Sequence, residues 1–161
     1  MEKEYKVDEV DLKILKILEE NSKTNYRKIS EDIGIAIGTV SNRINTLTEK
    51  GIIKKFTIDI DTIRIGYEIT ALILIQIEGK YISQVEEELI KNQNVYTIYD
   101  TTGDWDCIIA VKFKRVADLN NFLKNLNKIE HVHRTSTCVC LNVIKENTFF
   151  PIQLNEEKNK I

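Results

Sequence analysis

The sequence of 161 residues has no long hydrophobic run, and no apolar stretch approaches the roughly 18 residues that a membrane-spanning helix needs. The N-terminus, MEKEYKVDEVD, is charged and lacks the apolar core of a signal peptide. The three cysteines are an odd number without the spacing of a small disulfide framework, which fits a reducing compartment. We therefore expect a cytoplasmic protein.

Neither sign of charge is in large excess, because the net charge is −2 at pH 7. The total therefore gives no support for nucleic-acid binding, but its distribution does. Residues 21–55 hold seven Lys or Arg against three Asp or Glu, whereas the rest of the chain is acidic. A local basic excess of this kind can neutralise phosphates. With 42% hydrophobic and 30% charged residues, the chain has the composition of a soluble globular protein.

The first 50 residues predict three helices. Asp8 can cap the first, with Asp11 three positions later, and its apolar stripe is Val10, Ile14, Ile17 and Leu18. Asn25 can cap a second helix, and Gly34 allows the sharp turn that ends it.

The third helix places Val40, Ile44 and Leu47 at i, i+4 and i+7, which predicts a buried stripe. Its other face is polar, and Gly51 ends it. A polar face on the second of two short helices joined by a glycine turn is what reading of DNA base edges requires. An ordinary helical hairpin with a solvated face would give the same pattern.

After residue 55 the period of the sequence changes. Strict alternation over Phe56–Ile60 predicts a half-buried linking strand. Further on, a strand, a helix, two strands, a helix and a strand follow, predicted at residues 69–77, 82–91, 95–102, 107–113, 116–126 and 135–144. The order βαββαβ is typical of a ferredoxin-like, four-stranded antiparallel sheet with two helices on one face.

The sequence thus predicts an α+β protein with an N-terminal three-helix helix-turn-helix domain linked by a strand to a ferredoxin-like domain. The expected parts are a helix-turn-helix domain at 1–54, a linking strand and hinge at 55–66, an assembly or effector domain at 67–148 and a C-terminal tail at 149–161. The uncovered sheet face and the weak basic excess both favour a dimer that presents two copies to two half-sites.

This arrangement resembles the Lrp/AsnC family, the leucine-responsive and feast/famine transcription regulators, over about residues 7–146, and an archaeal member is expected. The motifs that carry the resemblance are Asp8, Asp11, Ile14-Leu15, Ile33-Gly34-Ile35, Thr39-Val40, Arg43-Ile44, Leu47, Gly51-Ile52-Ile53, Gly103-Asp104-Trp105-Asp106, Val132 and Thr135-Ser136-Thr137. The resemblance implies a homodimer that often assembles into tetramers or octamers, binding of palindromic promoter DNA, and commonly an amino-acid effector.

Three positions depart from the family pattern. Ala36 stands where the family usually has a serine cap on the recognition helix, which removes about 1 kcal/mol of helix-end stability. Thr62 occupies a position often held by proline, and Lys23 one often held by arginine. The change at Ala36 is expected to alter sequence preference or affinity rather than to abolish binding.

The residues expected to contact DNA fall into three groups. The recognition helix would read bases through Gly38, Thr39, Ser41, Asn42 and Thr46. Arg43 could contact a phosphate or form a salt bridge that packs the module. The basic residues expected at phosphates, with a merely solvated edge as the alternative, are Arg27, Lys28, Lys54 and Lys55.

An effector pocket is expected at the turn between the two middle strands, where free backbone N–H groups could hold an amino-acid carboxylate and Asp104 could bind its ammonium. A plain hairpin turn would explain the same residues, and Trp105 could instead anchor an interface. The expected effector residues are Gly103, Asp104, Trp105, Asp106, Thr135, Ser136 and Thr137.

No metal site, cofactor or catalytic residue is expected. His131 and His133, like Cys138 and Cys140, share a strand face, but neither pair has a partner at zinc-finger spacing. The histidines leave open an alternative, since siroheme decarboxylases resemble the same architecture. A nucleoid-like architectural protein with little sequence preference is the other alternative.

Overall fold

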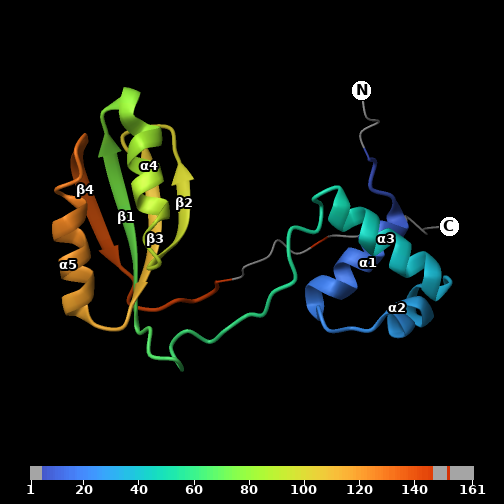
Figure 1. Ribbon diagram of the computed structural model, residues 1–161. Helices are drawn as coiled ribbons and strands as arrows, with labels where there is room; N and C mark the ends of the chain where they lie inside the picture. Colours follow the sequence, from blue (N-terminus) through green and yellow to red (C-terminus); the bar gives the residue numbers. More distant parts are fainter. Residues whose placement is uncertain (1–4, 147–151, 153–161) are drawn as a thin grey trace, which may run out of the picture. The chain divides into compact units, whose positions relative to one another are not determined.

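The structure is a computed structural model that describes residues 5–146 and Ile152. The chain forms two compact units, one built on the residues up to Asp59 and the other on Ile60–Glu146 (Figure 1). No helix among the described residues has the length and apolar character needed to cross a bilayer.

The first unit contains three helices, α1 (Glu9–Glu20), α2 (Tyr26–Ile33) and α3 (Ile37–Glu49). Their predicted ends are confirmed. Asp8 accepts a hydrogen bond from the Asp11 N–H at 2.9 Å while the Asp11 carboxylate accepts one from the Asp8 N–H at 3.1 Å, so both orphan donors are satisfied. Asn25 caps α2 by accepting from the Lys28 N–H at 2.8 Å.

The helices of this unit pack around a small core that contains the predicted stripes. Gly34 turns the chain between α2 and α3 at φ 77°, a conformation that favours glycine. Ala36 begins α3 without a side-chain hydrogen bond, as expected from the missing hydroxyl. The buried apolar side chains are Ile14, Leu18, Ile29, Val40 and Ile44, with Leu47 also fully buried.

The second unit is a four-stranded antiparallel sheet in the order β2-β3-β1-β4, which confirms the predicted ferredoxin-like fold. Both helices cover the same face of the sheet (Figure 1). The elements in chain order are β1 (Ile69–Ile77), the short 3-10 helix η1 (Gly79–Tyr81), α4 (Ile82–Ile90), β2 (Val95–Asp100), β3 (Cys107–Phe113), α5 (Val116–Leu126) and β4 (Val132–Val139).

The strands bury one face and leave the other open. On β1 the side chains of Ile73 and Ile75 are fully buried beneath the helices. The side chain of Leu72, which points to the opposite face of the sheet, is 42% exposed. The covered side forms the main core, whose buried members are Ala71, Ile73, Ile75, Ile77, Val85, Leu89, Cys107, Ile109, Val111, Phe113, Leu119 and Leu126.

Two strand predictions are wrong. Phe56–Ile60 is not a strand, because no neighbouring strand within the described residues offers it a hydrogen-bond ladder, and Phe56 and Ile58 are 53% and 66% exposed. The last strand runs over Val132–Val139 rather than 135–144. β4 pairs with β1 from Val132, opposite Ile77, to Val139, opposite Ala71. Because Ala71 lies close to Ile69, the first residue of β1, little of β1 remains for a longer β4 to pair with.

Other boundaries differ little from the prediction. The helix α4 ends one residue early, at Ile90, and β2 ends at Asp100, two residues early. The predicted C-terminal tail lies outside the described residues apart from Ile152, whose N–H donates to the Glu19 carboxylate at 3.0 Å.

Candidate nucleic-acid interface and effector site

The polar face of α3 is open within the described part of the first unit. Gly38, Thr39 and Asn42 are exposed, and Ser41 is half-buried. Within the described residues no side-chain hydrogen bond occupies the Asn42 amide, whereas its backbone carbonyl accepts one from the Thr46 hydroxyl at 2.9 Å. The amide therefore keeps a donor and an acceptor, the pair that can read adenine bidentately.

Gly38 is not required by packing inside the chain. A Cβ built at this position meets no atom within 4 Å, and its backbone has no positive φ. Glycine in a helix costs about 1 kcal/mol relative to alanine. The absence of an internal reason for Gly38 is consistent with close approach of an external surface to the start of α3.

Arg43 is held inside the unit. Its Nη1 atom lies 2.7 Å from the Asp8 carboxylate and 2.8 Å from that of Asp11, which is fully buried. The hydrogen bond to Asp8, followed by that to Asp11, raises the pKa of Arg43. The pKa of Asp8 is lowered, first by the Asp11 N–H and then by Arg43. The salt-bridge alternative for Arg43 is therefore the one that the structure shows.

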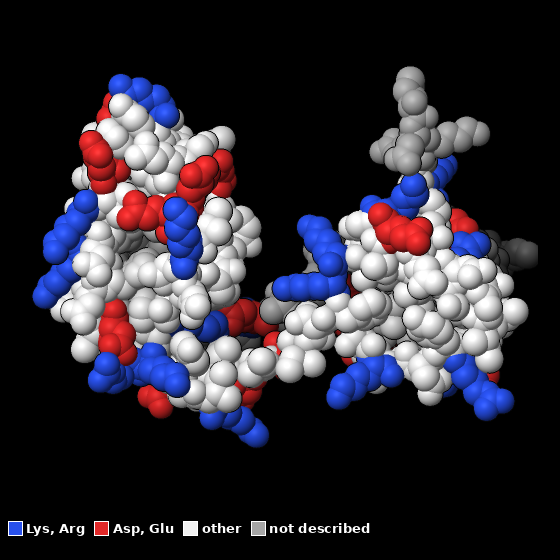
Figure 2. Space-filling view, viewed as in Figure 1, with Lys and Arg blue, Asp and Glu red and all other residues white. Residues whose placement is uncertain are grey.

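The other basic candidates differ in how they are engaged. Arg27 and Lys28 approach Glu31 and Asp32 one turn later at 3.8 and 2.5 Å, which reduces their local positive potential. Lys54 and Lys55 are exposed. In Figure 2 the lysine and arginine atoms of the first unit lie mostly at its edges, with uncharged surface between them, on the face shown. The face shown is thus not a continuous cationic patch.

The turn between β2 and β3 is a tight, internally bonded loop. Gly103 has φ 115°, a conformation that favours glycine. Thr101 donates from its hydroxyl to the Trp105 carbonyl at 2.7 Å and from its N–H to the Asp106 carbonyl at 3.0 Å. Asp104 is exposed at its tip.

Asp106 attaches this loop to the end of β1. Its N–H donates to the Ile75 carbonyl at 3.0 Å, and its carboxylate accepts from the Ile77 N–H at 2.8 Å. The Asp106 carboxylate therefore holds the loop to β1, a structural role that the sequence pattern did not reveal. Asp104 is the better placed of the two carboxylates for a ligand.

The three predicted effector residues on β4 do not all lie on the same face of the sheet. Thr137 pairs with buried Ile73 and so lies toward the helices, whereas Ser136 pairs with Leu74 and lies toward the open face. Thr135 donates to the Asn127 side chain at 2.9 Å, on the helix side. The structure brings the loop and the start of β4 to one end of β1. The side chains of the seven expected effector residues do not all meet there.

Arg134 is a residue of this region that the sequence did not single out. Its guanidinium carbon lies 5.1 Å from the centre of the Trp105 ring. Arg134 pairs with Gln76 and so shares the open face with Ser136. A cation beside the loop can bind a carboxylate. No local motif marked it, because only the pairing of β4 with β1 brings it near Trp105.

His131 packs against a neighbouring ring, whereas His133 is exposed. The His131 ring stacks on that of Tyr81 with centroids 3.3 Å apart and planes 7° apart. Its Nδ1 lies 3.3 Å from the Glu78 carboxylate. Within the described residues no group of three or more His, Cys, Asp or Glu side chains could hold a metal ion.

Two family models match the chain. The model of a winged helix-turn-helix DNA-binding domain matches residues 7–54, and the Lrp/AsnC ligand binding domain matches residues 70–149. The transcriptional regulator FL11 of Pyrococcus horikoshii is 41% identical over 148 residues, which cover 91% of this chain and 97% of the relative.

Solved structures agree with this result. E. coli AsnC superposes with a TM-score of 0.84 at 26% identity, covering 90% of this chain and 99% of that one. A regulator from Neisseria meningitidis in complex with L-methionine gives a TM-score of 0.85 at 21% identity over 91% and 97% of the two chains. The second likeness concerns the fold alone.

Proposed function

The chain belongs to the Lrp/AsnC family of DNA-binding transcriptional regulators, and we propose that it binds promoter DNA sequence-specifically as a dimer or higher oligomer under the control of an amino acid. The observation that carries the proposal is the exposed polar face of α3, whose Asn42 amide has no internal partner in the described chain. Its relatives are transcriptional regulators rather than enzymes, so the decarboxylase alternative is set aside.

Base reading is assigned to Gly38, Thr39, Ser41 and Asn42, with Thr46 one turn further along. Phosphate contacts are assigned to Lys54 and Lys55, with weaker contributions from Arg27 and Lys28 because each has an acidic neighbour. Arg43 positions α3 against α1 instead.

The test of base reading is Asn42→Ala. The variant should bind the protein's own promoter with less discrimination against single base-pair changes, since a good bidentate contact contributes about 1–3 kcal/mol. Asn121→Ala, at an exposed position of α5 in the other unit, is the matched control. Unchanged selectivity in Asn42→Ala would remove this residue from the reading group.

A dimer would cover apolar surface that the chain leaves exposed. Leu72 and Tyr99 of the open sheet face are 42% and 62% exposed. The segment before the sheet also exposes the apolar side chains of Phe56, Ile58, Ile60, Ile63 and Ile65. Burial of such surface is the main favourable term in association.

The dimer proposal can be tested by sedimentation. Leu72→Glu would place a charge in the interface and should convert the protein to monomers. Ile90→Glu is the matched control, because Ile90 is 69% exposed on α4, on the helix side of the sheet. Equal assembly of both variants would contradict an interface on the open face.

We propose that the effector binds at the loop between β2 and β3. The carboxylate of an amino acid would meet Arg134 and the free N–H groups of the loop, and its ammonium would meet Asp104. Because Trp105 is the only tryptophan of the chain, its fluorescence reports directly on this loop. Titration with the common amino acids should change that fluorescence for one or a few of them, and Asp104→Asn should abolish the change.

A further inference from the structure

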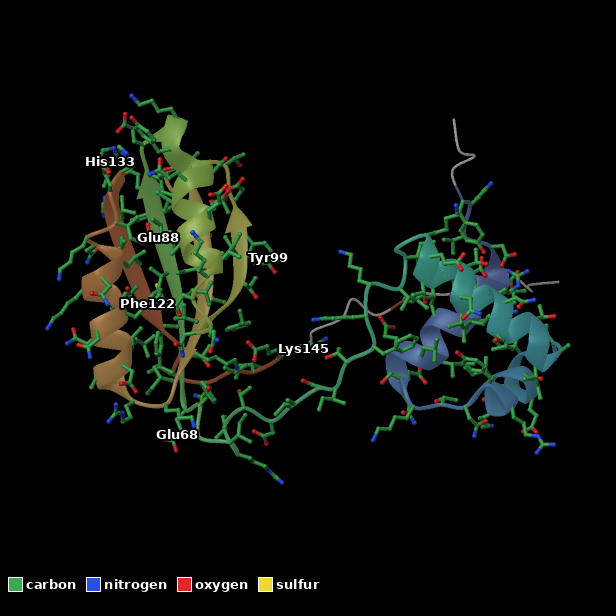
Figure 3. The ribbon with its side chains drawn as sticks, viewed as in Figure 1. Glu68, Glu88, Tyr99, Phe122, His133 and Lys145 are labelled. Carbon is green, nitrogen blue, oxygen red and sulfur yellow. The ribbon has the colours of Figure 1, made fainter. Side chains whose placement is uncertain are left out.

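A groove unrelated to the predicted effector loop runs between α4 and α5. It has a volume of about 760 Å³, within the range of small-molecule sites. Figure 2 shows this part of the second unit hollowed, and Figure 3 places Glu88 and Phe122 on the helix side of the sheet. Its floor consists of the apolar side chains Leu89, Phe113, Phe122, Leu126 and Ile129.

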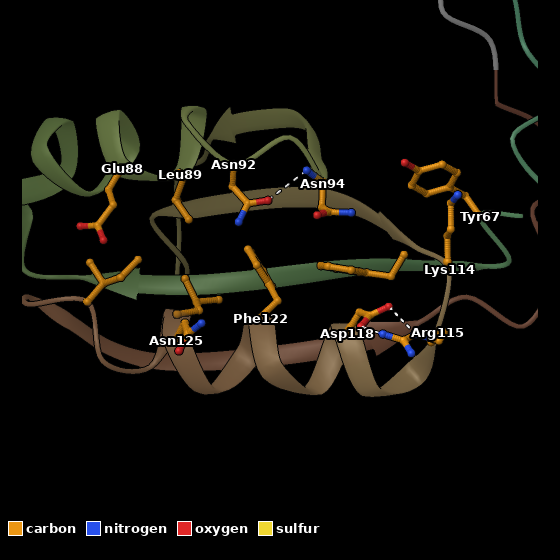
Figure 4. A pocket seen from close by; sticks show the side chains of 13 residues that line it. Tyr67, Glu88, Leu89, Asn92, Asn94, Lys114, Arg115, Asp118, Phe122 and Asn125 are labelled. Carbon is orange, nitrogen blue, oxygen red and sulfur yellow. Dashed lines mark hydrogen bonds and ion pairs between the residues drawn. The ribbon is translucent and has the colours of Figure 1, made fainter. Parts of the chain in front are cut away.

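The two ends of the groove carry opposite charges. Glu88 of α4 stands at one end, and Lys114, directly after β3, stands at the other (Figure 4). Within the described residues neither has an ion pair, and the Lys114 ammonium lies 5.2 Å from the centre of the Tyr67 ring. Arg115 and Asp118, by contrast, neutralise each other through two hydrogen bonds of 3.0 and 2.7 Å. Each end therefore offers one uncompensated charge.

The length of the groove follows from α5. Asp118 lies near the Lys114 end and Asn125 near the Glu88 end, seven residues later (Figure 4). At 1.5 Å of rise per residue, they are about 10 Å apart along the helix. Glu88 and Lys114 lie outside this pair of residues, so the two charges are at least this far apart (Figure 4). The ammonium and carboxylate of a single α-amino acid are attached to one carbon and cannot reach both ends. An extended peptide rises about 3.3 Å per residue, so three residues are the shortest peptide that could span the groove.

Amide side chains line the middle of the groove. Asn92 uses its oxygen to accept from the Asn94 N–H at 2.9 Å, which leaves its NH₂ group available. Asn94 donates its NH₂ to the Lys112 carbonyl at 2.7 Å, which leaves its oxygen available. A spare donor and a spare acceptor beside the half-buried Phe122 ring suit a peptide unit flanked by an apolar side chain.

We propose that this groove binds a free tripeptide with an apolar central residue, its N-terminal ammonium at Glu88 and its C-terminal carboxylate at Lys114. The central side chain lies on Phe122, and the peptide units pair with Asn92 and Asn94. The site does not depend on the DNA-binding proposal, since its residues all belong to the second unit.

Calorimetry on the full chain with Ala-Leu-Ala tests the site. The peptide with free ends should bind, and N-acetylation or C-amidation should each weaken binding about tenfold by removing one charge-assisted contact. Glu88→Gln should weaken binding of the free peptide but not of the acetylated one. Lys114→Met should weaken binding of the free peptide but not of the amidated one. This crossed pattern assigns each end of the peptide to one residue.

Matched variants control for net charge and for the other candidate site. Glu87→Gln and Lys124→Met change exposed side chains on the same two helices outside the groove and should leave affinity unchanged. Asp104→Asn should also leave it unchanged. Absence of binding at millimolar peptide, equal affinity for capped and free peptides, equal affinity for leucine alone, or loss of binding in Asp104→Asn would each overturn the proposal.

Discussion

The guanidinium of Arg43 on the recognition helix lies 2.8 Å from the fully buried carboxylate of Asp11 on the first helix. Asp11 also accepts hydrogen bonds from the Asp8 N–H at 3.1 Å and from the Tyr5 hydroxyl at 2.8 Å. A single buried carboxylate thus joins the cap of α1 to the middle of α3. This contact fixes α3 against α1, and with it the position of the proposed DNA-reading face.

Asp11→Ala should therefore destabilise the first unit by about 3 kcal/mol, because it leaves Arg43 without its buried partner. Asp32→Ala removes an exposed partner of Lys28 and should cost about 0.5 kcal/mol or less. Urea unfolding followed by far-ultraviolet circular dichroism measures both. The fluorescence of Trp105, in the second unit, should not shift. Equal stability of the two variants would contradict a central role for Asp11.

The same contacts predict acid sensitivity. The Asp11 N–H and the Arg43 guanidinium hold the pKa of Asp8 below its usual value near 3.8. A lowered pKa in the folded state contributes stability above pH 4, and this contribution is lost as the pH falls through the folded value. Asp8→Asn should flatten the acid dependence of helix unfolding below about pH 4. An unchanged slope would contradict the assignment.

Gly38→Ala should separate folding from DNA binding. Because the added Cβ meets no atom within 4 Å, the helix should gain up to about 1 kcal/mol. Promoter affinity should fall, since the methyl group would stand between α3 and the bases. Gly79→Ala, whose Cβ also meets nothing within 4 Å, should leave DNA binding unchanged. Full promoter affinity in Gly38→Ala would exclude a close backbone approach there.

The three cysteines should differ in reactivity. Burial, followed by the nearby carboxylates of Glu86 and Asp100, raises the pKa of Cys107 to about 11. Cys138 is exposed and Cys140 half-buried. Cys138 lies opposite Leu72 on the open face that the dimer would cover. In the monomer that Leu72→Glu should produce, iodoacetamide should thus modify Cys138 and Cys140 before unfolding and Cys107 only after it, as mass spectrometry can show. Rapid native labelling of Cys107 would contradict the packing of β3.

Much of the fold could be predicted from the sequence because local signals and tertiary packing agree. The cap at Asp8, the turn at Gly34 and the stripe through Val40 and Ile44 were all visible as patterns, and each is present. The prediction of a strand at 56–60 was wrong because alternating apolar and polar residues show only that one side could be buried. They do not show whether a neighbouring strand exists.

The candidate sites were less predictable than the fold. In the sequence, an arginine that binds a phosphate looks the same as one in an internal salt bridge. Only the position of Asp11 in the fold reveals the partner of Arg43. Asp106 and Arg134 depend on the register of β1 with its neighbours. The groove between α4 and α5 brings together segments far apart in sequence, and its opposite charges at Glu88 and Lys114 belong to no local motif.

Paired copies of α3 are proposed to read one DNA sequence. The most direct measurement compares affinity for the protein's own promoter with affinity for shuffled DNA of equal length across a salt titration. Specific reading predicts at least about a thousandfold preference for the promoter, retained as salt weakens both complexes through lost phosphate contacts. Equal affinities at every salt concentration would contradict specific reading and favour an architectural protein.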